Sequence, residues 1–543
     1  MKGESKDESN HSRLEIETAA VIGAGISGVV SAAHLLRAGI DVTVFERGDG
    51  VGGAWIYNEQ PDRDPPFPNE RIQSRPPAGT ASSDKLGHAE RTNGAMPGLD
   101  DAAHAFAPPG PVYTSMKSRS DEVQMRTTLR DWPDGIKAPI DPGDVVAYLR
   151  DIAEAYHVRD KIHFRTRVDS IARKGDGGWH VQTSTLLHNS SPTGVSQERK
   201  AWNFDAVAVA VGRNSIPRVP DVPGLSQWKA RFPSRIKHSK QYRSPEPYRN
   251  KTLLVVGAHV SALDITNHLV RGGVAKVYQS ARPREIDFRG LVDGDSGTCT
   301  TVLEKVAMVA EFAALVDGVG VGITPLDDGS PIPAKVLLQD GRVLDGIHHV
   351  LFTTGYLASF PFLGPDLEQP YTEPQDADET VIVTADARTV HNLHEDILYI
   401  PGPSLAFIGI SLYVSSFSMF DVQAQILAAV WAGRARLPSR AAMVEEQRRR
   451  KSLVQLLPGM TLDGVYLLDD FVMRRLLDWV NTDMAEAGGC RSQDILAGPD
   501  AKWWAAFRTK REYSRAVLGN LQDQYLRIYG TTWEELQSQD LHK

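Results

Sequence analysis

A glycine-rich turn near the start of the chain has the spacing of a phosphate-binding loop. Gly23, Gly25 and Gly28 follow a short apolar run and open a segment of helical pattern. The first glycine permits a tight turn, the second lets a pyrophosphate approach the backbone, and the third lets helix and strand pack closely. Glu46 ends the next apolar run, where a carboxylate can accept hydrogen bonds from a ribose diol. These residues predict a dinucleotide site; the alternative for Glu46 is a solvated charge at a strand end.

The residues that follow Glu46 narrow the kind of nucleotide. Arg47 comes next, and a double glycine, Gly52-Gly53, then precedes Trp55. An acid–arginine pair followed by this pattern resembles the FAD site of flavin monooxygenases more than a plain NAD site. Trp55 could instead fill the core, since tryptophan is largely buried on average.

A second turn of the same kind begins at Gly257 but departs from the pattern. It continues through Ser261 and has His259 where the second glycine is expected. A side chain there crowds a pyrophosphate, so we expect looser binding or a displaced phosphate. Ser280 and Arg282 close the next apolar run, where NADP sites hold the 2′-phosphate. An arginine suits that role because its guanidinium forms charged bidentate hydrogen bonds; the alternative is a solvated basic loop.

Between the two turns lies a stretch that resembles the identifying motif of class B flavin monooxygenases, F-x-G-x-x-x-H-x-x-x-(Y/F/W). The chain matches it with Phe232, His238 and Tyr242, while Ser234 replaces the glycine. The stretch Phe352 to Tyr356 resembles the family's second signature. The resemblance adds further cofactor-binding residues, which are Ser27, Val168, Thr354, Gly355, Tyr356 and Gln423.

The resemblance implies an α/β fold with two dinucleotide-binding, Rossmann-like domains, the NADPH domain being inserted into a discontinuous FAD domain. Its motifs run from about residue 19 to residue 439, and two β-turn-α-β units repeat along the chain. We expect a disordered tail at 1–17, the first part of the FAD domain at 18–225 with a long loop at 57–111, the NADPH domain at 226–345, the second part of the FAD domain at 346–439, and a helical region at 440–543.

The resemblance also implies a chemistry. In that family NADPH reduces FAD, and O2 adds to the reduced flavin to give a C(4a)-hydroperoxide, which transfers one oxygen atom to a small-molecule substrate. The family's Y-x-S-L-x-T-N stretch, whose asparagine lies beside the flavin, is matched by residues 113–119. Arg119 stands in place of the asparagine and Ser118 in place of the threonine, so these two are the candidate catalytic residues. The alternative for Arg119 is a surface position in a shifted loop.

Composition limits the other functional classes. The 543 residues include 60 Lys and Arg against 68 Asp and Glu, and the net charge of -8 argues against nucleic acid as the main partner. Only two cysteines occur, Cys299 and Cys490, which excludes a disulfide scaffold and a C-x-x-C redox centre. His391 and His394 share an H-x-x-H spacing, but without a further ligand cluster we expect loop histidines and no metal. We expect a cytoplasmic protein without a membrane span, and the sequence leaves a homo-oligomer open.

Three functions fit these residues. The first is an NADPH-dependent monooxygenase that acts on nitrogen or sulfur, as natural-product tailoring enzymes do. The second is a Baeyer–Villiger monooxygenase, whose motif prefers Trp followed by Pro or Asp, whereas this chain has Tyr242-Arg243. The third is a non-catalytic flavin-binding protein, degenerate at His259, Ser234 and Arg119.

Overall fold

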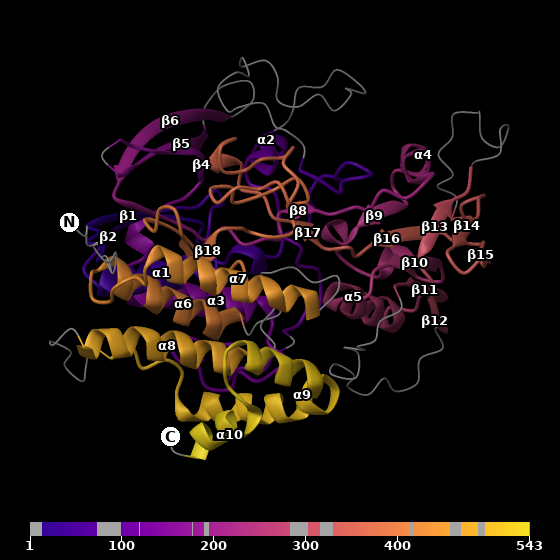
Figure 1. Cartoon of the computed structure of the whole chain (residues 1–543). Coiled ribbons are helices and arrows are strands. Elements are labelled where there is room, and N and C mark those ends of the chain that lie inside the picture. The colour runs from indigo at the N-terminus through magenta and orange to yellow at the C-terminus, as the bar shows by residue number, and fades with distance from the viewer. Residues whose placement is uncertain are drawn as a thin grey trace, which may run out of the picture.

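A seven-stranded sheet forms the centre of the first nucleotide-binding unit in the computed structural model (Figure 1). β1 (Thr18–Ile22) lies between β2 (Asp41–Phe45) and β7 (Ala206–Val209), and the three strands are parallel. The sheet is completed by β3 (Ile162–His163), β18 (Leu393–His394), β19 (Leu398–Tyr399) and β20 (Leu405–Phe407). The structure describes residues 13–72, 99–118, 120–175, 177–188, 195–282, 302–314, 329–411, 416–456, 468–486 and 495–541.

A five-stranded parallel sheet forms the second unit, at the right of Figure 1. Its strands, in spatial order, are β12 (Val302–Val306), β11 (Lys276–Ser280), β10 (Thr252–Val256), β16 (His349–Phe352) and β9 (Ile236–His238). The chain enters this unit from the first sheet and later returns to it, which confirms the expected insertion of one dinucleotide-binding domain into another. The crossing points meet in a two-stranded sheet of β8 (Ile216–Pro217) and β17 (Tyr356–Leu357).

Two antiparallel sheets extend the units. The first is a meander of β4 (Thr166–Arg173), β5 (Trp179–His188) and β6 (Val195–Phe204), and the second consists of β13 (Val309–Phe312), β14 (Val336–Leu338) and β15 (Val343–Leu344). Helices of the two units are α1 (Ile26–Arg37), α2 (Leu99–Phe106), α3 (Pro142–Ala155), α4 (Leu225–Arg231) and α5 (Val260–Arg271). Short 3₁₀ turns lie at Gly53–Trp55, Arg159–Lys161, Ser239–Gln241, Glu246–Tyr248 and Pro361–Leu363.

The C-terminal part is helical and packs onto the first unit. α6 (Ser416–Trp431) is buried along almost its whole length and packs against α1 on one side and α8 (Asp469–Glu486) on another. A helix buried all round is apolar over most of its surface, as the Phe, Met, Ile and Val residues of α6 make it. The remaining helices are α7 (Arg440–Leu456), α9 (Ala501–Ile528) and α10 (Trp533–Leu541); Figure 1 shows α8, α9 and α10 as an outer layer.

Two expected boundaries are corrected by the structure. β16 pairs with β10 and β9, so the strand His349–Phe352 belongs to the inserted unit rather than to the returning FAD segment at 346–439. The end of the expected disordered tail is ordered, because the Ile16 N–H donates to the Trp431 carbonyl at 2.9 Å and Leu14 packs against the core. Residues 1–12 lie outside the described residues, as do residues 73–98 of the expected loop.

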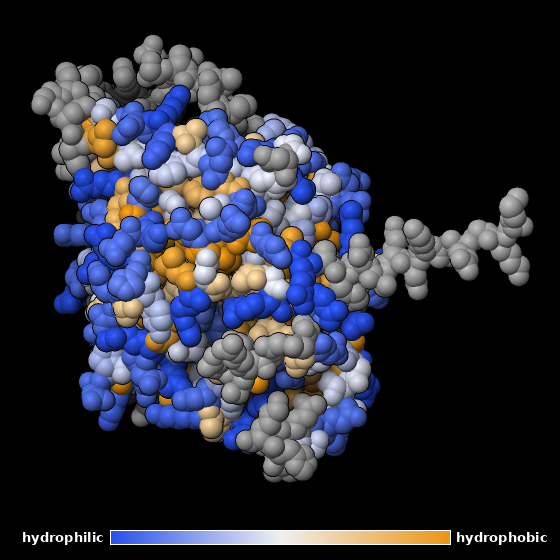
Figure 2. Space-filling model, turned by 90° about the vertical axis from the view of Figure 1, so that its left-hand side faces the viewer, coloured by the Kyte–Doolittle hydropathy of each residue, from blue (hydrophilic) through white to orange (hydrophobic). Residues whose placement is uncertain are grey.

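The length and hydropathy of a helix determine whether it can span a membrane. Among the described residues, no helix combines the length and the apolar character that crossing a bilayer requires. Figure 2 shows the face at the left of Figure 1, which is mostly hydrophilic and is crossed by a band of hydrophobic residues.

Candidate active site

A cleft of about 2780 Å³ opens beside the first glycine turn. Its walls come from the ends of β1 and β2, the antiparallel meander, the segment 359–372 and residues on both sides of the long insertion after Trp55. The carboxyl ends of parallel strands are where open α/β sheets bind nucleotides. The position and size of the cleft therefore match a site for a large dinucleotide.

The first turn brings bare backbone to the edge of the cleft. Gly23 has φ +104°, and a Cβ on Gly28 would lie 1.8 Å from the Gly23 carbonyl oxygen, so helix and strand touch there. Gly25 faces Gly53, whose φ is +55° and whose Cβ would lie 2.8 Å from the Gly25 Cα. Two glycines thus meet without side chains at the edge of the cleft, and we call them the Gly25–Gly53 cradle. This fits a pyrophosphate lying against bare backbone at a helix N-terminus.

Glu46 and Arg47 line the cleft at the end of β2. The Glu46 carboxylate accepts the backbone N–H groups of Ala24 and Gly48, each at 2.7 Å. These bonds fix its orientation and leave further acceptor positions, because a carboxylate offers about four. A ribose diol can use those positions, so the environment of Glu46 favours the nucleotide role over a solvated charge.

The other residues expected near FAD lie along the same cleft, with one exception. Ser27, Trp55 and Val168 line it. Gln423 is fully buried behind it and supports the wall, since its Oε1 accepts from the Gly409 N–H at 3.2 Å and its Nε2 donates to the Ser411 hydroxyl at 3.2 Å. Gln423 is therefore placed to shape the cleft rather than to line it.

The second turn is built like the first but does not line this cleft. Gly257 has φ +136°, and a Cβ there would lie 2.4 Å from the Thr353 Oγ1, so the position requires glycine. His259 occupies the N-cap of α5 with extended backbone and is half-buried. Ser261 is exposed on the first turn of the helix. The histidine therefore stands at the helix N-terminus, the place where its side chain is expected to crowd a phosphate.

The surroundings of Ser280 do not favour its expected role at the 2′-phosphate. Its side chain is buried, the hydroxyl donates to the Ala307 carbonyl at 2.9 Å, and it accepts from the Val309 N–H at 3.2 Å. Its single donor is thus not available to a phosphate.

Arg282, the other residue expected at the 2′-phosphate, is exposed. Burial lowers the pKa of Arg218, and the positive charges of Arg388 and Arg282 lower it further. Sequence reasoning missed Arg218, because it lies far from the second turn along the chain. Arg218 thus lies within electrostatic range of Arg282.

His238 of the identifying motif lies at the junction of the two units. His238 is fully buried, its Nδ1 accepts from the Lys240 N–H at 3.1 Å, and its Nε2 contacts the Gly355 carbonyl at 3.1 Å. Burial lowers the pKa of His238 to about 3, so the ring is neutral and Nε2–H is the donor. The histidine therefore joins the end of β9 to the turn before β17.

The other signature residues surround the same junction. The Thr354 hydroxyl donates to the Arg218 carbonyl, and the Tyr356 ring meets the His238 ring edge-on at 5.4 Å. The Tyr242 hydroxyl contacts the His268 Nδ1 at 3.0 Å, while Phe232 packs in the core of the inserted unit. These contacts favour a structural role for both signatures, between the two nucleotide sites.

Of the expected catalytic pair, the structure describes only Ser118. The Ser118 hydroxyl donates to the Ser120 carbonyl at 2.9 Å and accepts from the Ile140 N–H at 2.8 Å, so it joins two loops. Ser118 does not line the cleft, so these contacts favour a structural role, and the catalytic role expected for it stays a prediction. Arg119 lies outside the described residues, and its role stays a prediction.

Sequence reasoning also missed a buried ion pair in the cleft wall. The Lys240 Nζ donates to the Asp62 carboxylate and to the Ser215 carbonyl, both at 2.6 Å, and the lysine is almost fully buried. The His104 Nε2 lies 4.0 Å from the other Asp62 oxygen. The signal in the sequence was weak, because Asp62 and Lys240 are 178 positions apart.

Comparison with known proteins agrees with this geometry. Residues 115–286 and 332–463 match the family model described as flavin-binding monooxygenase-like, and residues 21–76 match an NAD(P)-binding Rossmann-like domain. The chain belongs to the flavin-binding monooxygenase family. The cofactors of this monooxygenase are FAD and NADPH, its reaction consumes O2, and its substrate is a small molecule.

Relatives of this monooxygenase match most of its length. It is 32% identical to the flavin-containing monooxygenase ustF2 of Aspergillus flavus over 92% of this chain and 97% of that protein. It is 29% identical to the flavin-containing monooxygenase iboF of Amanita muscaria, over 80% and 82% of the two chains. Its fold is similar to that of the S-allyl-L-cysteine S-oxygenase of Allium sativum, with TM-score 0.58, 22% identity, and coverage of 91% and 98%.

Proposed function

We propose that this monooxygenase oxidises NADPH and transfers one atom of O2 to nitrogen or sulfur of a small molecule, as a tailoring step in secondary metabolism. The other oxygen atom leaves as water. The observation that supports the proposal is the cleft lined by the Gly25–Gly53 cradle, Glu46 and residues of the segment 359–372. A relative named as a flavin-containing monooxygenase matches almost the whole chain, which supports the same chemistry.

FAD supplies the oxygen chemistry, and the protein supplies binding, orientation and protection from water. Gly25 and Gly53 would hold the pyrophosphate, and Glu46 the ribose. Arg282, with Arg218 nearby, would hold the 2′-phosphate of NADPH, since phosphate prefers guanidinium groups. The pair Tyr242-Arg243, in place of the Trp-Pro or Trp-Asp pair that Baeyer–Villiger enzymes prefer, favours nitrogen or sulfur over ketone oxidation.

The test separates three outcomes with one purified sample. The holoenzyme is reduced with NADPH without oxygen, then mixed with oxygen and a panel of amines, thioethers and ketones, and the products are identified by mass spectrometry. We expect flavin bleaching by NADPH and a gain of one oxygen atom on an amine or thioether. Esters formed only from ketones would replace the proposal by Baeyer–Villiger chemistry, and bound FAD that NADPH does not reduce would replace it by a non-catalytic role.

A further inference from the structure

The insertion between Trp55 and Tyr113 contributes one wall of the cleft. Ala103, His104 and Phe106 of α2 line it, and residues 107–111 continue the same wall. Figure 1 shows α2 close to β4 and above the two-stranded junction of β8 and β17. Residues 103–111 are the second limb of the insertion along the cleft, and we call them the covering segment.

The covering segment runs along the half of the cleft assigned to adenosine and pyrophosphate. In its first half Phe106 is 3% exposed, and the Arg167 guanidinium lies 4.8 Å from the Phe106 ring centroid, next to Val168 in β4. In its second half a Cβ on Gly110 would lie 3.3 Å from the carbonyl oxygen of Ala54, the neighbour of Gly53. The segment therefore extends from the wall formed by β4 to the Gly25–Gly53 cradle.

One guanidinium joins the two ends of the insertion. The Arg243 Nε donates to the Asn58 carbonyl at 2.7 Å, and its Nη2 donates to the Gly110 carbonyl at 3.1 Å. Its Nη1 donates to the carbonyls of Lys240 and Tyr242, which fixes the side chain to the junction motif. The planar guanidinium can serve these separate acceptors at once, whereas a lysine ammonium is a compact group without that fork.

His104 of the covering segment lies beside a buried ion pair in the cleft wall. The buried Lys240–Asp62 pair faces His104, whose Nε2 is 4.0 Å from the Asp62 carboxylate. Asp62 follows Asn58 in the first limb of the insertion, and His104 precedes Gly110 in the second. Both limbs are thus tied to the 240–243 stretch, Asp62 through Lys240 and the two ends through Arg243.

We propose that Arg243 is a positioning residue that holds the covering segment over the adenosine and pyrophosphate half of bound FAD, and so limits the rate at which FAD leaves. The inference rests on FAD as the cofactor of this family and not on the substrate proposed above. A cofactor covered by protein leaves only when the cover opens, and the Arg243 hydrogen bonds oppose that opening. Loss of one such charged hydrogen bond corresponds to a roughly ten- to hundredfold change in rate.

The experiment measures exchange of bound FAD for an excess of radiolabelled FAD in the holoenzyme, without NADPH. Arg243→Ala should exchange FAD roughly ten- to hundredfold faster than the wild type. Phe106→Ala should also exchange FAD faster, because it removes the packing of the segment against β4. The double variant should exchange no faster than the faster single variant, because both changes release the same segment.

Arg249→Ala is the matched control and should exchange FAD at the wild-type rate. Arg249 is an exposed arginine close to Arg243 in sequence, and it does not line the cleft. Its backbone N–H donates to the Glu246 carbonyl at 3.3 Å, a contact that the substitution keeps.

Two results would overturn the proposal. One is exchange at the wild-type rate in Arg243→Ala, and the other is a double variant whose acceleration is the product of the two single effects. Thermal unfolding distinguishes this positioning role from a purely structural one. If Arg243 were only structural, Arg243→Ala would lower the Tm of the apoprotein and of the holoenzyme equally. If Arg243→Ala does not fold, Arg243→Lys and Phe106→Ala decide the question by the same exchange rates.

Discussion

Among single residues, the glycines of the first turn are required for different reasons. A Cβ on Gly28 would collide with the Gly23 carbonyl oxygen at 1.8 Å, which is a conflict within the protein itself. A Cβ on Gly25 would meet only the Gly53 Cα, at an ordinary 3.5 Å, and the backbone there is extended with φ −78°. Gly28 therefore protects the fold, and Gly25 leaves room for the cofactor.

Substitution should separate these two roles. Gly25→Val should fold with a Tm near that of the wild type but contain little FAD, because its methyl groups occupy the space of the pyrophosphate. Gly28→Ala should lower the Tm strongly, since the Gly23 backbone that it meets cannot yield. The measurements are flavin absorbance per protein and thermal unfolding, with Gly143→Ala as control because its Cβ meets nothing within 4 Å. Full flavin occupancy in Gly25→Val would contradict the assignment of the turn.

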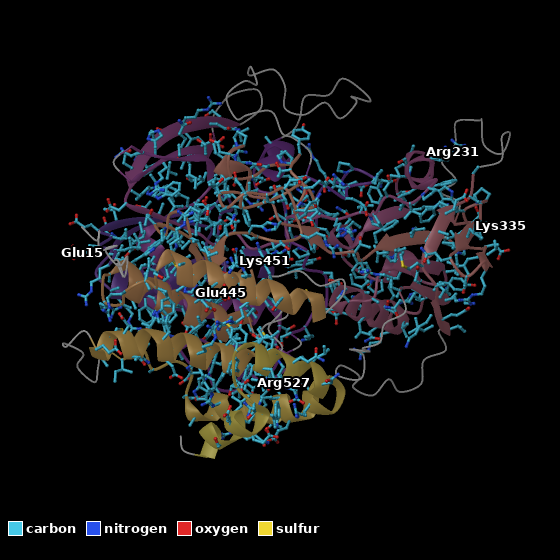
Figure 3. The ribbon with its side chains drawn as sticks, viewed as in Figure 1. Glu15, Arg231, Lys335, Glu445, Lys451 and Arg527 are labelled. Atoms are coloured by element: carbon cyan, nitrogen blue, oxygen red, sulfur yellow. The ribbon has the colours of Figure 1, made fainter. Side chains whose placement is uncertain are left out.

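Arg282 should decide the preference for NADPH over NADH. Removing a charged hydrogen-bonding partner costs about 1.5–3 kcal/mol, so Arg282→Ala should raise the apparent constant for NADPH roughly ten- to hundredfold. NADH lacks the 2′-phosphate, so the apparent constant for NADH should change little. Steady-state oxidation of both nucleotides measures the difference, and Lys335→Ala, an exposed cation at the outer end of the same unit in Figure 3, is the control. Equal losses for both nucleotides would show that Arg282 is structural.

Among the elements, β9 and β17 are joined by one neutral histidine, His238. The same contact joins the two nucleotide-binding units. His238 ends β9 and bonds to Gly355, directly before β17, so the ring connects the inserted sheet to the crossing strands. A buried imidazole that donates one hydrogen bond and accepts another cannot take up a proton without losing its acceptor. The junction should therefore be sensitive to acid.

The pH dependence follows from the two pKa values of His238. The unfolded chain binds a proton below the ordinary value of 6.5, whereas burial lowers the folded pKa to about 3. Between these values the unfolded state holds more protons, so the free energy of unfolding falls as the pH is lowered, by up to about 1.4 kcal/mol per pH unit for this residue. Urea unfolding across that window should show a shallower slope in His238→Gln. The exposed His157→Gln is the control, and an unchanged slope in His238→Gln would contradict the neutral buried ring.

Across the whole molecule, buried ion pairs attach the C-terminal helices to the first unit. The turn between β18 and β19 carries Glu395 and Asp396, which pair with Arg475 of α8 and Arg450 of α7. Burial alone raises the pKa of Glu395, but Arg475 outweighs it and holds the pKa below its usual value.

The residues beside this turn include a group of metal-ligand types, contributed by the turn and by α7. His394, Glu395 and Glu446 bring possible metal-ligand atoms within 4.8 Å of one another. The guanidinium groups of Arg475 and Arg450 already supply positive charge beside these carboxylates. This arrangement favours an ion-pair network over a metal centre.

Breaking this network should loosen the helices without emptying the cleft. Glu395→Gln leaves the Arg475 guanidinium, which is 28% exposed, without its charge partner, and such a loss costs about 2–3 kcal/mol. FAD content should stay at the wild-type level because Glu395 does not line the cleft. Urea unfolding and flavin absorbance measure the two effects. Glu445→Gln, on the exposed side of α7 in Figure 3, should change stability by no more than about 0.5 kcal/mol. Equal stability changes in the two variants would contradict the network.

Residue type and spacing were enough to predict the family, the two nucleotide-binding units and the first glycine turn. A positive φ or a close backbone approach admits glycine and little else, as at Gly23 and Gly53, so such positions are visible in the chain itself. The folded molecule was needed to show that Ser118 and Ser280 are occupied within the fold and that β16 belongs to the inserted sheet. It was needed equally for the link that Arg243 makes between the two ends of the insertion. A hydroxyl or guanidinium can serve many acceptors, and which one it serves depends on segments far apart in the chain that only folding brings together.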